Sequence, residues 1–119
     1  RRCGWIDLVA LKYACMINGV TKIVMTKADI LDVLDELQVC YAYRVNGTET
    51  QQVPYQMQRS QPEPLYKSFE GWKQPSDKIT SYDALPEKMR TYIQYLSDYL
   101  KVPLKYISIG PGRDQLITH

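Results

Sequence analysis

Four consecutive residues, Thr26-Lys27-Ala28-Asp29, combine side chains that could recognise a purine base. They follow a short apolar run, Ile23-Val24-Met25, of the kind that forms a fully buried parallel strand. Guanine presents two adjacent N–H donors on one edge, and the two oxygens of the Asp29 carboxylate could accept both. Adenine lacks this pair of donors, so Asp29 would also select the base. The aliphatic part of Lys27 would cover the face of the base while its ammonium stays in water.

The position of this tetrapeptide supports the same interpretation. Many GTP-binding proteins have [Asn/Thr]-Lys-x-Asp after a buried strand, and open α/β sheets bind ligands at the carboxyl ends of their strands. Alone, a four-residue match is more often a solvated turn. A second turn, Ser108-Ile109-Gly110-Pro111-Gly112-Arg113, ends another strand predicted over residues 104–109. A backbone N–H there could donate to guanine O6, and Gly110 would allow close approach of the base, although Gly-Pro-Gly alone predicts only a tight turn.

Hydrophobic spacing predicts the elements that position these two turns. Apolar residues at three- and four-residue spacing indicate helices over residues 7–18 and 86–101, each directly before one of the two strands. This order indicates an α/β fold. One or two helical turns are expected over residues 30–36, with Asp32 and Asp35 facing water. These two acids have no His or third acid at ligand spacing, so no metal site is predicted.

The middle of the chain predicts antiparallel strands. Asn46-Gly47 is a strong hairpin signal between alternating segments. The strands are expected over residues 38–45, 48–53 and 65–69, with an irregular excursion over residues 54–64 and a turn-rich stretch over residues 71–83. Trp72 is expected to anchor that stretch in the core. Tyr41 and Tyr43 near Arg44 could instead form a stacking platform for single-stranded nucleic acid, but a packed sheet face is the commoner role.

Composition limits the class of protein. The 119 residues allow one domain with a modest core, and a net charge of +2 is too small to indicate nucleic-acid or membrane-surface binding. No apolar run approaches membrane-spanning length, and no signal peptide is expected. Three cysteines without metal-ligand spacing indicate reduced thiols in a cytoplasmic protein. Cys15 and Cys40 are expected in the core.

Several stretches together resemble the adenylosuccinate synthetase family. They comprise Arg1-Arg2-Cys3-Gly4-Trp5-Ile6-Asp7-Leu8-Val9-Ala10, Thr26-Lys27-Ala28-Asp29-Ile30-Leu31-Asp32, Val39-Cys40-Tyr41-Ala42-Tyr43, Glu70-Gly71-Trp72, Leu85-Pro86, Val102-Pro103 and the run from Ser108 to Arg113. The match runs in register from the first residue nearly to the last. It implies that the chain, which opens without Met, is the C-terminal part of a protein several times longer.

The resemblance implies an activity, a fold and partners. The activity is GTP-dependent ligation of IMP and L-aspartate to adenylosuccinate, with release of GDP and phosphate, in AMP biosynthesis. Mg²⁺ is required, and the family members are typically homodimers. The fold is a large GTPase-like mixed sheet with flanking helices. Residues 1–119 would be its C-terminal portion with an antiparallel hairpin, a single incomplete domain.

The resemblance also implies site residues. By match, the guanine site comprises Lys27, Ala28 and Asp29 with the second loop Ser108, Ile109 and Gly110, while Arg1 lies among the bound substrates. The family usually has leucine at Ala28 and threonine at Ile109, and neither change removes a group that would recognise guanine. The family's glycine-rich phosphate loop, catalytic Asp and catalytic His belong to the N-terminal part. We therefore expect catalytic residues and Mg²⁺ ligands outside this chain, which alone should be inactive. The alternative is a free-standing α/β nucleotide- or protein-binding module without catalysis.

Overall fold

The fold is described from a computed structural model of the chain. This structure describes residues 4–54, 61–76, 78–110, 112 and 115–119. The described residues form two α-helices, two short 3₁₀ helices and seven strands. They are β1 (Ile6–Asp7), α1 (Leu8–Ile17), β2 (Ile23–Met25), η1 (Ala28–Val33), β3 (Glu36–Val45), β4 (Thr48–Thr50), β5 (Glu63–Glu70), η2 (Tyr82–Ala84), α3 (Glu87–Leu100), β6 (Leu104–Ser108) and β7 (Leu116–Thr118).

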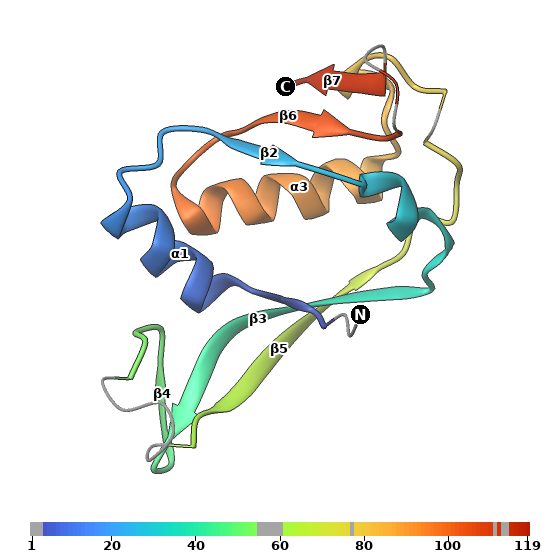
Figure 1. Ribbon diagram of the computed structural model, residues 1–119. Helices are drawn as coiled ribbons and strands as arrows, with labels where there is room; N and C mark the ends of the chain where they lie inside the picture. Colours follow the sequence, from blue (N-terminus) through green and yellow to red (C-terminus); the bar gives the residue numbers. More distant parts are fainter. Residues whose placement is uncertain (1–3, 55–60, 77, 111, 113–114) are drawn as a thin grey trace.

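These strands form two sheets with helices between them (Figure 1). In the first sheet β3 pairs in parallel with β1 and antiparallel with β4 and β5. In the second sheet β6 pairs in parallel with β2 and antiparallel with β7. Helix α3 lies between the sheets, and its neighbour α1 packs against both α3 and β3 (Figure 1). This mixed α/β architecture confirms the predicted fold class.

Local sequence explains where both helices begin and end. The Asp7 carboxylate accepts a hydrogen bond from the backbone N–H of Ala10 at 3.1 Å, which caps the start of α1. Gly19 follows the helix with a positive φ of 61°, a conformation that glycine adopts without strain. Pro86 directly precedes α3, and an apolar stripe then enters the core. The buried residues of this stripe are Met89, Tyr92, Ile93, Leu96 and Leu100.

The structure confirms most of the predicted elements. Both helices, the strands that follow them, and the burial of Cys15, Cys40 and Trp72 are as expected. Asn46 and Gly47 both have positive φ values, 52° and 80°, as the predicted two-residue hairpin requires.

Other predictions about the strands were wrong. Val24 is 52% exposed, whereas the apolar run predicted full burial. Ile23 and Met25 pack against the core, and the alternation of side chains along β2 turns Val24 to the opposite face of the smaller sheet. The return strand β4 ends at Thr50 rather than at residue 53, and β5 begins at Glu63, inside the expected excursion. Strands β1 and β7 were missed, since two or three residues give no readable alternation. Residues 55–60 lie outside the described residues.

Candidate functional site

The pairing of β2 with β6 brings the two predicted turns together. The strands run in parallel, with Met25 opposite Ile107, so both end at the same edge of the smaller sheet. Residues 26–29 leave this edge after β2, and residues 108–110 leave it after β6. The first turn continues into η1, which contacts β6. The sequence therefore predicted correctly that these distant segments are neighbours, while their role in binding stays a prediction.

The first turn presents two of its three predicted residues at the surface. Lys27 is exposed and has left-handed backbone angles (φ 55°, ψ 37°) at the start of η1. Asp29 is partly exposed in the first turn of that helix. Ala28 is fully buried in the main hydrophobic cluster. Because neither its side chain nor its backbone is exposed, the structure does not support the predicted contact between Ala28 and guanine.

The second turn is held by Gln115, which the sequence did not single out. The backbone N–H of Ile109 donates to the Gln115 carbonyl at 2.9 Å, and the backbone N–H of Gly112 donates to Oε1 of Gln115 at 2.8 Å. A Cβ at Gly110 would lie only 2.2 Å from Nε2 of Gln115, so the present position of this side chain leaves room only for a glycine. The Ser108 hydroxyl donates to the Gly110 carbonyl at 3.1 Å. Gln115 lies directly before β7. Because this strand was not predicted, no sequence pattern pointed to Gln115.

Asp32 is buried, which corrects the prediction that it faces water. It is 9% exposed, and its carboxylate accepts hydrogen bonds from three donors on two residues. Nε1 of Trp72 lies 2.7 Å from Oδ1, and the backbone N–H of Ser76 lies 2.7 Å from Oδ2. The Ser76 hydroxyl lies 2.8 and 3.0 Å from the two oxygens. Trp72 and Ser76 are 40 or more positions away in sequence, so local spacing could not show that they would surround Asp32.

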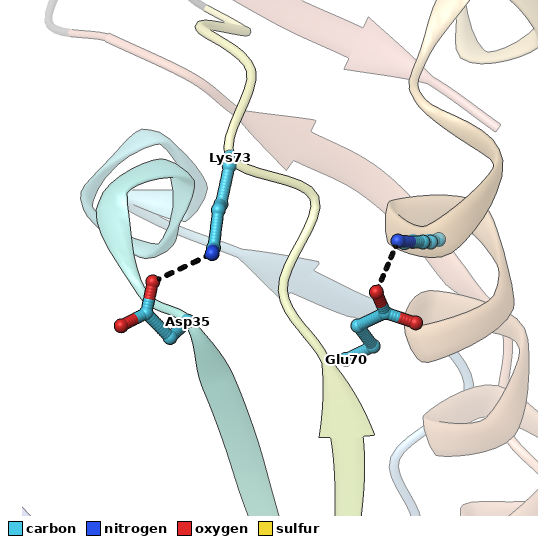
Figure 2. A network of polar contacts seen from close by, with 4 residues as sticks. Asp35, Glu70 and Lys73 are labelled. Atoms are coloured by element: carbon cyan, nitrogen blue, oxygen red, sulfur yellow. Dashed lines mark ion pairs between the residues drawn. The ribbon is translucent and has the colours of Figure 1, made fainter.

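The segment after β5 is tied to its surroundings by two exposed ion pairs (Figure 2). Lys73 reaches Asp35, with its Nζ 2.9 Å from the carboxylate, and Glu70 points to α3, where it pairs with Lys88 at 2.6 Å. The hydrogen bond and charge of Asp35 raise the pKa of Lys73, and those of Lys88 lower the pKa of Glu70. Exposed pairs of this kind stabilise weakly.

Among the hollows on the surface of the described residues, two differ in their relation to the predicted site. One, of about 580 Å³, is lined by Asp29, Asp32, Val33, Lys73 and Pro75, and it adjoins the first turn. The other, of about 880 Å³, lies between α1, residues 51–53 and the end of α3. It includes none of the predicted site residues. The hollow of about 580 Å³, which Asp29 lines, is therefore the one that bears on guanine recognition.

Other functional possibilities find less support. Among the described residues, no group of three or more His, Cys, Asp or Glu could hold a metal ion, and no helix is long and apolar enough to cross a membrane. The oxygens of Asp32 already accept from neutral donors, so this acid does not suit Mg²⁺. The tyrosine platform is contradicted: Tyr43 is buried and donates its hydroxyl to Asp7 instead of presenting a free ring. Arg1 lies outside the described residues.

Comparison with known proteins gives a consistent result. The sequence profile of a family described as adenylosuccinate synthetase matches residues 1–117. The adenylosuccinate synthetase of Parabacteroides distasonis is 48% identical over 118 residues, which are 99% of this chain and 28% of that protein. That of Schizosaccharomyces pombe is 44% identical over 119 residues, or 27% of its length. The chain thus spans a little over a quarter of the relatives that it matches.

A solved structure shows the same fold. It is described as fully ligated adenylosuccinate synthetase from Plasmodium falciparum, and it superposes on all of this chain with a TM-score of 0.93 at 35% identity. The aligned region is 29% of that protein. Profile, sequence relatives and solved structure agree over essentially the whole chain, and the chain therefore belongs to the adenylosuccinate synthetase family.

Proposed function

We propose that this chain is the guanine-recognition part of an adenylosuccinate synthetase. The whole enzyme would ligate IMP and L-aspartate to adenylosuccinate with consumption of GTP, a step of AMP biosynthesis in the cytoplasm. The observation that supports this most directly is the pairing of β2 with β6. It places a Thr-Lys-Ala-Asp turn beside a glycine-containing turn at the carboxyl ends of two parallel strands, where α/β sheets bind nucleotides.

Each predicted residue has a separate role in this proposal. Asp29 accepts hydrogen bonds from the N1–H and the amino group of guanine, and the stem of Lys27 covers the base. The N–H of Ile109 already donates to Gln115, so the N–H of Gly110 is the better donor for guanine O6. Ala28 and Ile109, both fully buried, hold the two turns in the core, and Ser108 fixes the second turn through the Gly110 carbonyl.

The rest of the reaction belongs to parts of the enzyme beyond these residues. Activation of phosphate, the Mg²⁺ ligands, and most contacts with IMP and L-aspartate would come from the N-terminal part of the protein. Arg1 would contribute a guanidinium, which can hold an anionic substrate group through two parallel hydrogen bonds. The enzyme would act as a homodimer.

The substitution Asp29→Asn in the full-length protein tests the guanine site. Asparagine keeps one acceptor but turns an NH₂ donor toward the donors of guanine, so one charged hydrogen bond is lost. Such a bond contributes about 1.5–3 kcal/mol, which corresponds to a rise of about 10- to 100-fold in KM for GTP. The preference for GTP over ITP should relax, because ITP lacks the amino group. Glu49→Gln on the distant hairpin is the control and should change neither value. Unchanged kinetics of Asp29→Asn with both nucleotides would refute the assignment.

A free-standing binding module remains the second candidate, and the mass of the native protein decides between the two. The protein can be captured from its source with an antibody to this chain and measured intact. A mass several times 13.8 kDa supports the synthetase, whose activity with GTP, IMP and L-aspartate can then be assayed on the whole protein. A mass near 13.8 kDa would contradict catalysis and leave a guanine- or partner-binding module.

A further inference from the structure

We infer that Asp32 is a positioning residue for guanine recognition: its buried hydrogen bonds to Trp72 and Ser76 fix the direction in which Asp29 points. This inference rests on the proposed function, since Asp29 is the residue that would contact the base. Asp32 itself would not touch the nucleotide. Its carboxylate is occupied by donors of the protein.

The geometry of η1 links the two acids. Asp29 and Asp32 are three residues apart in a 3₁₀ helix, which has three residues per turn, so their side chains lie one above the other. Both line the same surface hollow. A rotation of the helix about its axis would therefore move both side chains together. Fixing Asp32 inside the protein fixes the direction of Asp29 at its surface.

The short helix cannot fix this direction alone. Runs of 3₁₀ helix have poor hydrogen-bond geometry, and η1 has 3.2 Å bonds from Ile30 to the Lys27 carbonyl and from Leu34 to the Leu31 carbonyl. It begins at Lys27 in left-handed geometry without a side-chain cap, a conformation that non-glycine residues adopt at some cost. Its orientation must come from contacts with the rest of the fold. Ala28 and Leu31 pack against the core, and Asp32 adds buried hydrogen bonds near the end of the helix.

The donors that hold Asp32 belong to a firmly placed segment. The backbone N–H of Gly71 donates to the Asp35 carbonyl at 2.9 Å, which ties the segment to the start of β3. The ring of Trp72 packs against Tyr92 of α3, with 6.1 Å between the ring centroids. The hydrogen bonds of Asp32 therefore connect η1 to the body formed by β5 and α3. The exposed Lys73–Asp35 pair spans the same two segments but is open to solvent (Figure 2).

The chemistry of this network makes it sensitive to an isosteric change. All three groups that face Asp32 are donors: an indole N–H, a backbone N–H and a hydroxyl. A carboxylate can accept from all of them, whereas asparagine would point its NH₂ group at one or more of them. Asp32→Asn therefore keeps the shape of the side chain and breaks the network. Trp72→Phe removes one donor and keeps an aromatic ring, and Ser76→Ala removes only the hydroxyl.

The test compares kinetics in the full-length protein. Asp32→Asn should raise KM for GTP by about tenfold and relax the preference for GTP over ITP, while KM for IMP and kcat stay within about twofold. Trp72→Phe and Ser76→Ala should shift KM for GTP in the same direction by a smaller factor. The matched control is Asp35→Asn, which removes the same charge three residues away at an exposed position and should leave all these values unchanged.

The comparison with Asp29→Asn separates the two proposals. If Asp29→Asn relaxes base preference and Asp32→Asn does not, the positioning role is refuted and the guanine site stands. If neither variant changes base preference, the guanine site itself is refuted. A change of equal size in KM for GTP, KM for IMP and kcat would show a general structural role and would overturn the inference. If Asp32→Asn does not fold, Trp72→Phe and Ser76→Ala decide the question through the same ratios.

Discussion

Replacing Gly71 by alanine should destabilise the protein strongly, although alanine is the smallest possible addition. A Cβ at this position would lie 1.9 Å from the carbonyl oxygen of Leu34, 2.9 Å from its carbonyl carbon and 3.0 Å from that of Asp35. All three atoms belong to the backbone, so no side chain can rotate away. The two segments would have to separate by more than about 1 Å to reach ordinary van der Waals contact.

The magnitude follows from what this separation disrupts. Forcing extra atoms into a packed interior typically costs about 1–3 kcal/mol. The hydrogen bond from the Gly71 N–H to the Asp35 carbonyl would be stretched or lost, at about 1 kcal/mol. The sum, about 2–4 kcal/mol, is a large part of a typical unfolding free energy of about 5–15 kcal/mol. Trp72 would move with its neighbour, so Asp32 would also lose a donor.

Two other glycines provide a graded comparison. A Cβ at Gly4 meets no atom within 4 Å, so Gly4→Ala should leave stability unchanged. The atoms nearest to a Cβ at Gly110 belong to the terminal amide of Gln115, which can rotate away but then loses its bond to Gly112, at about 1 kcal/mol. Urea unfolding of the full-length variants, followed by tryptophan fluorescence, should show a loss of unfolding free energy that increases from Gly4→Ala to Gly110→Ala to Gly71→Ala. An unfolding midpoint for Gly71→Ala equal to that for Gly4→Ala would refute the reasoning.

Two further predictions concern the core around α3. Met89→Ala should lower the unfolding free energy by about 2–5 kcal/mol, because Met89 is fully buried, whereas Met16→Ala, at a position 72% exposed, should change it by less than about 0.5 kcal/mol in the same urea assay. Burial raises the pKa of Tyr92 to about 12 from 10.0, so the folded state keeps a proton that the unfolded chain releases. The contribution of Tyr92 to the unfolding free energy should therefore be intact below pH 10 and be lost between about pH 10 and 12. Tyr92→Phe should reduce this loss. A variant whose unfolding free energy depends on pH in the same way as that of the unsubstituted protein would contradict the prediction.

The sequence was informative where a pattern is local. The spacing of apolar residues showed both helices, and Asn46-Gly47 showed the hairpin, since each depends on residues within a few positions of one another. The interpretation of the two turns as parts of one guanine site also implied that they would be neighbours, and the pairing of β2 with β6 agrees. The resemblance to a family added Ala28, Ser108 and Ile109 to the candidate guanine site and placed Arg1 among the substrates, which spacing alone could not provide.

The rest depends on distant partners. Asp32 has the sequence context of a solvated acid, and only the fold reveals the donors of Trp72 and Ser76 around it. Val24 has the character of a buried residue, but its exposure depends on whether another element covers the outer face of the smaller sheet. The crowding around Gly110 similarly comes from Gln115, which lies directly before a return strand too short to predict.

The parallel pairing of β2 with β6 also has a consequence for folding. The pair joins Met25 to Ile107, so it closes a loop of about 80 residues that contains β3, β4, β5 and α3. Contacts of such high sequence separation form late, because the entropy of closing the loop must be lost before they can stabilise anything. The turns after β2 and β6 would then come together only after the intervening elements have folded. A guanine nucleotide that bridges the turns would bind only the closed state, and it would thereby shift the last step of folding toward the native protein.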